Sequence, residues 1–275
     1  MIERCLLKCR RHILATVIAL GVVGPFALCG QGPGRGGGPP QSAQAHAPVD
    51  ITGYWVSVVT EDWRWRMVTP RRGDYPSVPL TPAGRKLADA WDPAKDTASG
   101  EQCKAYGAPG AMRLPTRLHI TWQDPNTLKL EADNGTQTRL FHFLGSQAFI
   151  LESEGAPVPG LSATAPSWQG ESLAEWEFAG EPTRGEGPEA KGGDLKLITR
   201  NMRPGYLQKN GVPYGGNAVL TEHFNRMDEP SGTSWLLDVA TVVDPEYLRA
   251  RFIRSTHYKR EPDGSKWDPS PCEAM

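Results

Sequence analysis

Short segments of alternating apolar and polar residues follow one another from residue 50 onward, and they constrain the fold more than any other feature. Some ten of these segments have the β-branched and aromatic composition that is typical of strands. A single short helix, from Pro82 to about Trp91, is expected among them. No stretch of helical period separates the strands, which excludes a parallel α/β sheet. We therefore expect an all-β domain whose antiparallel strands form a barrel or a sandwich.

Turn signals place the connections between these strands. Asn134-Gly135 predicts a tight hairpin, since both central positions of such a turn need a positive φ. The low-complexity residues 179–193 contain no core-forming side chains, so we expect them to lengthen a hairpin that pairs Glu177 with Asp194. Alternation continues through residues 63–67, which predicts that the first strand region puts both tryptophans of this stretch on one face.

The N-terminal 30 residues have the features of an export signal. A basic region that contains Lys8, Arg10 and Arg11 precedes an apolar stretch, Ile13–Leu28, that is too short for a stable membrane span. We expect cleavage near residue 30 and a periplasmic or secreted protein. Cys29 leaves a lipoprotein as an alternative, although lipid attachment usually needs a small residue in the preceding position.

A linker and a single domain follow the signal. Residues 31–49 are rich in Gly and Pro and are expected to be disordered, whereas residues 50–275 form one β domain. The chain has a net charge of −1, and residues 1–30 carry +3, so the remainder carries about −4. Such a mildly acidic domain has no basic footprint for a phosphate backbone, which argues against a nucleic-acid partner.

Two cysteines, Cys103 and Cys272, lie in the domain. In an exported protein their simplest state is a disulfide, which would join the tail to the early part of the domain. Two buried thiols or one reactive cysteine are the alternatives.

The first strand carries Gly53-Tyr54-Trp55, which resembles the Gly-x-Trp signature of lipocalin-type, calycin-like barrels. In those barrels the tryptophan closes one end and a late arginine packs over it, so the resemblance implies that Arg251 or Arg254 takes this place. Residues 50–275 also resemble a family of uncharacterised exported bacterial proteins. The shared pattern comprises Leu80-Thr81-Pro82, Cys103, Pro166-Ser167-Trp168-Gln169-Gly170, Trp176-Glu177, Asp194-Leu195, Asp244-Pro245 with Tyr247, and Cys272-Glu273.

In that family Trp-Glu runs directly into Gly-Asp-x-Leu as a tight hairpin, and here residues 178–193 separate the two halves. The resemblance implies the calycin-like fold and export. It implies no activity.

Known enzyme motifs are absent: the sequence has no Gly-x-Ser-x-Gly, His-Glu-x-x-His, Cys-x-x-Cys or dinucleotide-binding fingerprint. We therefore expect neither a cofactor nor a metal. Acid–base chemistry would have to use a strand histidine or a carboxylate that faces a cavity. The alternative for each is an ordinary residue on the outer face of the sheet. The candidate catalytic residues are His119, His142, Glu175, Glu222, His223 and His257.

Tryptophan, tyrosine and arginine side chains form the most informative group. Aromatic side chains supply a large apolar area with a polar handle, and guanidinium groups can bind a carboxylate or stack on a ring. The alternative is that most of these aromatics pack the core. The candidate ligand-binding residues are Trp63, Arg64, Trp65, Arg66, Trp122, Trp176, Arg200, Arg203, Tyr206 and Tyr214.

Three functions are compatible with these features. The first is an exported protein that binds a small apolar, aromatic or lipid-like molecule in the lumen of its barrel. The second is a cofactor-free isomerase, cyclase or hydrolase on the same barrel, with a histidine or a buried glutamate as acid or base. The third is an interaction module of the cell envelope. A contiguous exposed apolar patch would favour this function. The oligomeric state is left open.

Overall fold

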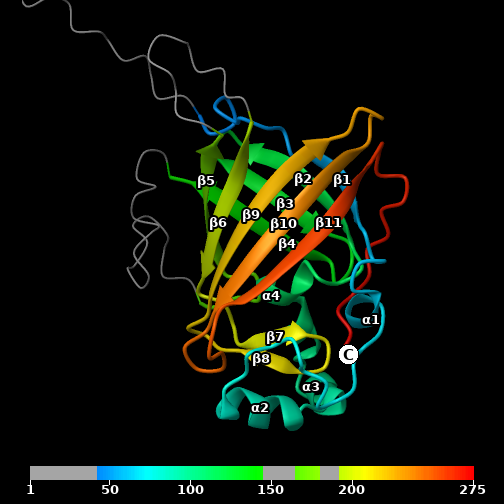
Figure 1. The fold of residues 1–275 in the computed structure, drawn as a ribbon, viewed down its shortest axis with the longest axis vertical. Coiled ribbons are helices and arrows are strands. Elements are labelled where there is room, and N and C mark those ends of the chain that lie inside the picture. Colours follow the sequence, from blue (N-terminus) through cyan, green and yellow to red (C-terminus); the bar gives the residue numbers. More distant parts are fainter. Residues whose placement is uncertain (1–41, 145–164, 180–191) are drawn as a thin grey trace, which may run out of the picture. The chain divides into compact units, whose positions relative to one another are not determined.

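The computed structural model describes residues 42–144, 165–179 and 192–275, and nine of the strands in this part of the chain form a closed barrel (Figure 1). Their order around the barrel is β1-β11-β10-β9-β6-β5-β4-β3-β2. The expected all-β barrel is therefore confirmed. The barrel strands are β1 Gly53–Ser57, β2 Arg117–Asp124, β3 Thr127–Ala132, β4 Gln137–Phe143, β5 Glu171–Phe178, β6 Gly193–Arg200, β9 Val219–Asp228, β10 Ser234–Val243 and β11 Phe252–Glu261.

One neighbouring pair, β4 and β5, is parallel, and the other pairs of the barrel are antiparallel. A closed barrel with an odd number of strands cannot alternate direction all the way round, so at least one pair must be parallel. A parallel pair needs a long connection rather than a tight turn. Residues 144–170 supply it between β4 and β5.

The predicted hairpins are present, with one change of detail. Glu177 pairs with Asp194 across β5 and β6, as expected. In the turn after β3 the residues with positive φ are Gly135 (82°) and Thr136 (49°), so the left-handed conformation begins one residue later than predicted.

The barrel interior is filled by the alternate residues of its strands. Trp55 is completely buried and donates a hydrogen bond from Nε1 to the Ile51 carbonyl (3.0 Å). The guanidinium of Arg260, in β11, lies 4.9 Å from the Trp55 ring centroid. The arginine over the first-strand tryptophan is therefore Arg260, and the expectation of Arg251 or Arg254 is wrong.

One end of the barrel, which we call the base, is covered by short helices and a hairpin (Figure 1). We count as the base residues 58–116, 201–218, 244–251 and 271–275. Two of its helices begin where the sequence provides a cap: the hydroxyl of Thr81 accepts from Gly84 N, and the carboxylate of Asp92 accepts from Ala94 N. The sequence predicted one helix, whereas several short helices form in this part of the described chain. The elements of the base are α1 Trp63–Arg66, α2 Pro82–Asp89, α3 Pro93–Ala98, the 3₁₀ helix η1 Gln102–Tyr106, α4 Ala108–Ala111, β7 Gly205–Gln208 and β8 Val212–Tyr214.

The predicted strand at residues 63–67 is wrong, because these residues form the single helical turn α1. Strict alternation over five residues also places Trp63 and Met67 four apart, on one face of a helix. Both are exposed (60% and 52%), whereas Arg66 is buried on the other side.

The end of the predicted linker is ordered. Residues 42–49 lie against the barrel, where Gln44 N donates to the Pro125 carbonyl (3.0 Å) and Val49 packs on the core. The expectation of disorder is therefore wrong for this part of residues 31–49. The signal segment and residues 31–41 lie outside the described residues, as does most of the 179–193 excursion.

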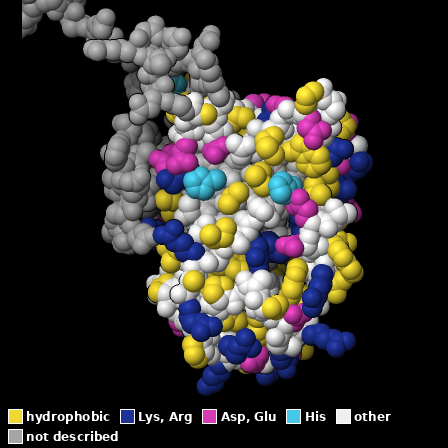
Figure 2. Space-filling view, viewed as in Figure 1, with side chains coloured by type: hydrophobic (Ala, Val, Ile, Leu, Met, Phe, Trp, Pro, Cys, Tyr) yellow, Lys and Arg dark blue, Asp and Glu magenta, His cyan; other side chains and the backbone are white. Residues whose placement is uncertain are grey.

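Cys103 and Cys272 form the expected disulfide (Figure 1 shows the C-terminus beside the base). Within the described residues, no helix is long and apolar enough to cross a membrane. On the face drawn in Figure 2, Lys and Arg side chains gather over the base.

Candidate functional site

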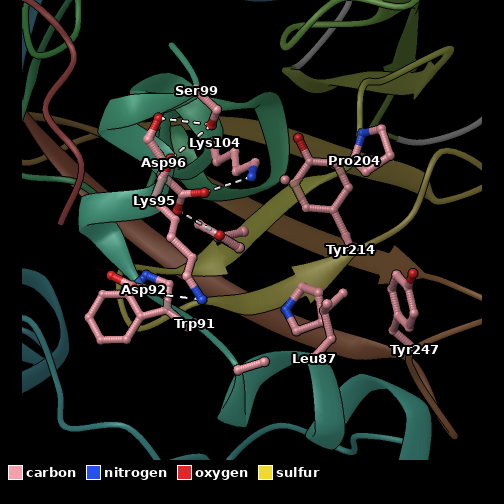
Figure 3. A pocket seen from close by; sticks show the side chains of 14 residues that line it. Leu87, Trp91, Asp92, Lys95, Asp96, Ser99, Lys104, Pro204, Tyr214 and Tyr247 are labelled. Carbon is pink, nitrogen blue, oxygen red and sulfur yellow. Dashed lines mark hydrogen bonds and ion pairs between the residues drawn. The ribbon is translucent and has the colours of Figure 1, made fainter.

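A groove of about 430 Å³ opens on the base, between α2, α3 and the β7–β8 hairpin (Figure 3). This volume is within the range of about 300–1,000 Å³ that small-molecule sites occupy. Its walls come from segments far apart in the sequence, so only the folded chain brings them together. The lining residues are Leu87, Ala90, Trp91, Asp92, Lys95, Asp96, Ser99, Lys104, Pro204, Gly205, Tyr206, Pro213, Tyr214 and Tyr247.

Four of the fourteen residues that line the groove are aromatic. Trp91 follows α2, Tyr206 and Tyr214 come from the hairpin, and Tyr247 lies in the loop between β10 and β11. Tyr214 is completely buried and its hydroxyl has no hydrogen-bond partner among the described residues. A Cβ atom at Gly107 would lie 2.1 Å from this hydroxyl oxygen, so the ring can occupy its place only because that residue is glycine.

A charged cluster forms one side of the groove (Figure 3). The buried carboxylate of Asp96 accepts from Lys104 Nζ (2.6 Å) and from the hydroxyl of Tyr206 (2.7 Å). Burial, followed by the contact with Asp96, raises the pKa of Tyr206, which keeps its phenol protonated. Lys95 stands at the rim with 81% of its side chain exposed, and it makes a long ion pair of 3.8 Å with Asp92.

A second polar group crosses the interior of the barrel. Arg139, from β4, forms two hydrogen bonds with the carboxylate of Glu222, from β9 (2.8 and 2.5 Å), and one with Thr199 (3.2 Å). The side chains of Arg139 and Glu222 are 2% and 0% exposed. Such a paired charge is tolerated in a core because each partner compensates the other.

Asp238, from β10, lies beside this pair and has no hydrogen-bond partner for either carboxylate oxygen among the described residues. Burial, and then the neighbouring Glu222 carboxylate, raise the pKa of Asp238 well above its usual range. Asp238 and Glu222 both line a cavity of about 10 Å³ under α4. That is about the room that a single water molecule needs.

The candidate histidines all lie in strands, as predicted, but they occupy the outer face of the barrel and do not converge. Their ring Nδ1 atoms contact separate partners: Glu131 for His119 (3.3 Å), Thr127 for His142 (3.4 Å), Glu177 for His223 (3.2 Å) and Glu61 for His257 (2.5 Å). Glu175 is also outside, paired with Lys196 (2.9 Å). Of the six candidate acid–base residues, Glu222 is the one that faces the interior. No cluster of three or more metal-ligating side chains occurs in residues 42–144, 165–179 and 192–275.

The Trp63–Arg66 turn does not line the groove. Arg64 pairs with Asp74 (2.6 Å) and lies over the Trp65 ring, 4.9 Å from its centroid. Arg66 is buried and donates to the Val58 carbonyl (3.0 Å).

Four other candidates are divided between the two ends of the barrel. Trp122 and Trp176 line a depression of about 320 Å³ at the end opposite the base. The indole N–H of Trp176 donates to the Ala43 carbonyl (2.9 Å), so residues 42–52 already cover this aromatic pair. Arg203 pairs with Glu101 (2.6 Å) and stacks on Trp168, and Arg200 ends β6 near the base. Of the ten predicted ligand-binding residues, the groove brings together Tyr206 and Tyr214.

The groove also contains residues that the sequence did not indicate, namely Trp91, Lys95, Asp96 and Lys104. Asp92-Pro93 predicted the end of a helix, but the same pair is also a start signal, with Asp as N-cap and Pro in the first turn. Interpreting it as a start would have predicted α3 and brought Asp96 into consideration.

No protein-family model, curated protein or solved structure matches this chain.

Proposed function

We propose that this is an exported protein that binds a small, largely apolar, ring-bearing molecule in the groove of its base. The aromatic lining of this groove is the observation that carries the proposal. Trp and Tyr rings bind other rings through large apolar contacts in offset or edge-to-face geometry. A mostly apolar concave surface with a few fixed polar groups is the usual form of a small-molecule site.

The groove fits such a ligand better than the lumen does. Many inward side chains of the described strands, among them Leu118, Leu128 and Phe224, are completely buried against one another. The depression beside Trp122 and Trp176, at the far end of the barrel, is already covered by residues 42–52. The cavity beside Glu222 has room for about one water. We therefore place the ligand outside the barrel, in contrast to the lumen site that the sequence led us to expect.

Charge at the rim favours a ligand that carries an acidic group. The Asp96 carboxylate is already compensated by Lys104 and Tyr206, whereas Lys95 at the rim has, among the described residues, a carboxylate no nearer than Asp92 at 3.8 Å. A carboxylate or phenolate on the ligand would pair with Lys95 while its ring contacts Trp91 and Tyr247.

The enzyme alternative depends on Glu222 and Asp238, the buried carboxylates that face the interior cavity. Their one-water cavity gives a substrate no room next to these groups, so binding without catalysis is the better account. Export is proposed on the basis of the disulfide, since such bonds persist in oxidising compartments.

The test is a titration with 2-naphthoate, monitored through the intrinsic tryptophan fluorescence, to which Trp91 contributes from the groove. We expect quenching in the wild-type protein and loss of binding in Ala90→Trp, which fills the groove from an exposed position. The matched control is Ala83→Trp, at an exposed position of α2, the helix that Ala90 caps, and it does not line the groove.

If Ala90→Trp and Ala83→Trp bind 2-naphthoate equally well, the ligand is not in this groove. Absence of binding to 2-naphthoate and to the apolar control naphthalene would contradict the ligand class itself.

A further inference from the structure

Exposed charges are divided between the two ends of the molecule. The base carries eight exposed cationic side chains against four exposed acidic ones, and the rest of the described chain carries two against seven. Figure 2 shows the cations gathered over the base on one face. The eight cations are Arg64, Arg71, Arg72, Arg85, Lys86, Lys95, Arg249 and Arg251. The base is therefore a cationic end of a domain whose net charge is small.

Exposed apolar side chains also lie on the base or next to it. Trp63 (60%), Met67 (52%) and Val68 (49%) lie on and after α1, Leu87 (45%) lies on α2, and Ile253 (56%) begins β11 next to the base. Phe178 and Met227 are the two large apolar side chains that are comparably exposed elsewhere in the described residues. A surface that combines Lys and Arg with Trp and Leu has the chemistry of an interfacial membrane contact.

We propose that the base docks onto an anionic lipid surface. Its cations would attract the lipid headgroups, and Trp63, Met67 and Leu87 would enter the headgroup region of the bilayer. Leu87 also lines the groove, so docking would bring the groove next to the membrane. This goes beyond the proposed function, because the surface would bind lipid whether or not the groove binds a ligand.

Charge complementarity and apolar exposure together favour lipid over a nucleic acid or another soluble polyanion. A polyanion would use the arginines and lysines but would gain little from exposed aliphatic side chains. A membrane uses both, and its attraction for the cations falls off within a Debye length, about 10 Å at 0.1 M salt.

The experiment is co-sedimentation of the purified, disulfide-bonded protein with vesicles of phosphatidylcholine, with and without phosphatidylglycerol. We expect binding that requires phosphatidylglycerol, weakens with salt and shifts the intrinsic tryptophan emission to the blue. Removing one cation near such a surface costs about fivefold in partitioning, so Lys86→Gln/Arg249→Gln should reduce binding about 25-fold. The matched control, Lys259→Gln/Lys266→Gln, changes the exposed cations away from the base and should have no such effect.

The apolar contribution is tested by Trp63→Ser, with Phe178→Ser as the control at a comparably exposed position. Trp63→Ser should weaken vesicle binding several-fold. If it does not, and heparin or single-stranded DNA competes as well as the vesicles, the base is a general polyanion surface and the proposal is wrong. Equal losses in the Lys86/Arg249 and Lys259/Lys266 variants would also overturn it. Naphthoate binding is measured separately in the same variants, so that a failure of lipid docking can be distinguished from a failure of ligand binding in the groove.

Discussion

The Arg139–Glu222 pair gives the sharpest test of how the barrel interior is held together. Both side chains are at most 2% exposed, and Arg139 binds both oxygens of the Glu222 carboxylate. Arg139→Met removes the cation and leaves a buried carboxylate with no compensating charge. We expect it to lower the free energy of unfolding by about 3–5 kcal/mol, a large part of the roughly 5–15 kcal/mol that a domain has.

The double variant Arg139→Met/Glu222→Leu removes both charges and fills similar volume with apolar groups. Its stability should return to within about 1–2 kcal/mol of the wild type, since replacing a buried ion pair is often neutral. Urea denaturation of the oxidised protein measures all three free energies of unfolding and gives the coupling between the two sites.

A surface pair provides the comparison. Lys196→Met breaks the contact with Glu175 on the outer face of the barrel, where the two side chains are 16% and 19% exposed, and we expect it to cost about 0–1 kcal/mol. The reasoning is refuted if Arg139→Met costs no more than Lys196→Met, or if the double variant is as unstable as the sum of its single changes.

Two further predictions concern Asp238 and the disulfide. Burial holds the Asp238 pKa well above its usual range, so the folded state keeps a proton that the unfolded chain releases near pH 4. The stabilising contribution is therefore complete below that pH and falls by up to about 1.4 kcal/mol per pH unit as the pH rises to the folded-state pKa. Urea denaturation between pH 4 and 8 measures the free energy of unfolding, and Asp238→Asn should abolish its fall with pH. If the wild type and Asp238→Asn show the same dependence on pH, the prediction is wrong. Removing the Cys103–Cys272 bond, which closes a separation of 169 residues, should lower stability by about 4–5 kcal/mol in Cys103→Ser/Cys272→Ser. Thermal unfolding checks this, and an unchanged midpoint would show that the tail is held by other contacts.

Much of the barrel could be predicted because alternation is a local property of the chain. Leu118 and Ile120 alternate with His119 in β2, and the side-chain period of two holds for any strand with one buried face. The same reasoning failed at Trp63–Met67, where five alternating residues are too few to distinguish a strand from one helical turn. It also could not show that Glu222 faces inward toward Arg139, because a one-residue change of register reverses the face of every side chain.

Local patterns in the sequence predicted most of the strands and turns, and the presence of two domain cysteines favoured their pairing. Such features depend on the pleat of the backbone, on turn chemistry and on the number of cysteines present. Only the tertiary structure decided that β4 and β5 run parallel, that Arg260 covers Trp55, and that Trp91, Asp96 and Tyr214 meet in one groove. These are contacts between segments far apart in the chain, and they arise from closing nine strands and packing helices over one end. Neither the closure of the barrel nor the packing of the helices over its end produces a periodic pattern in the sequence.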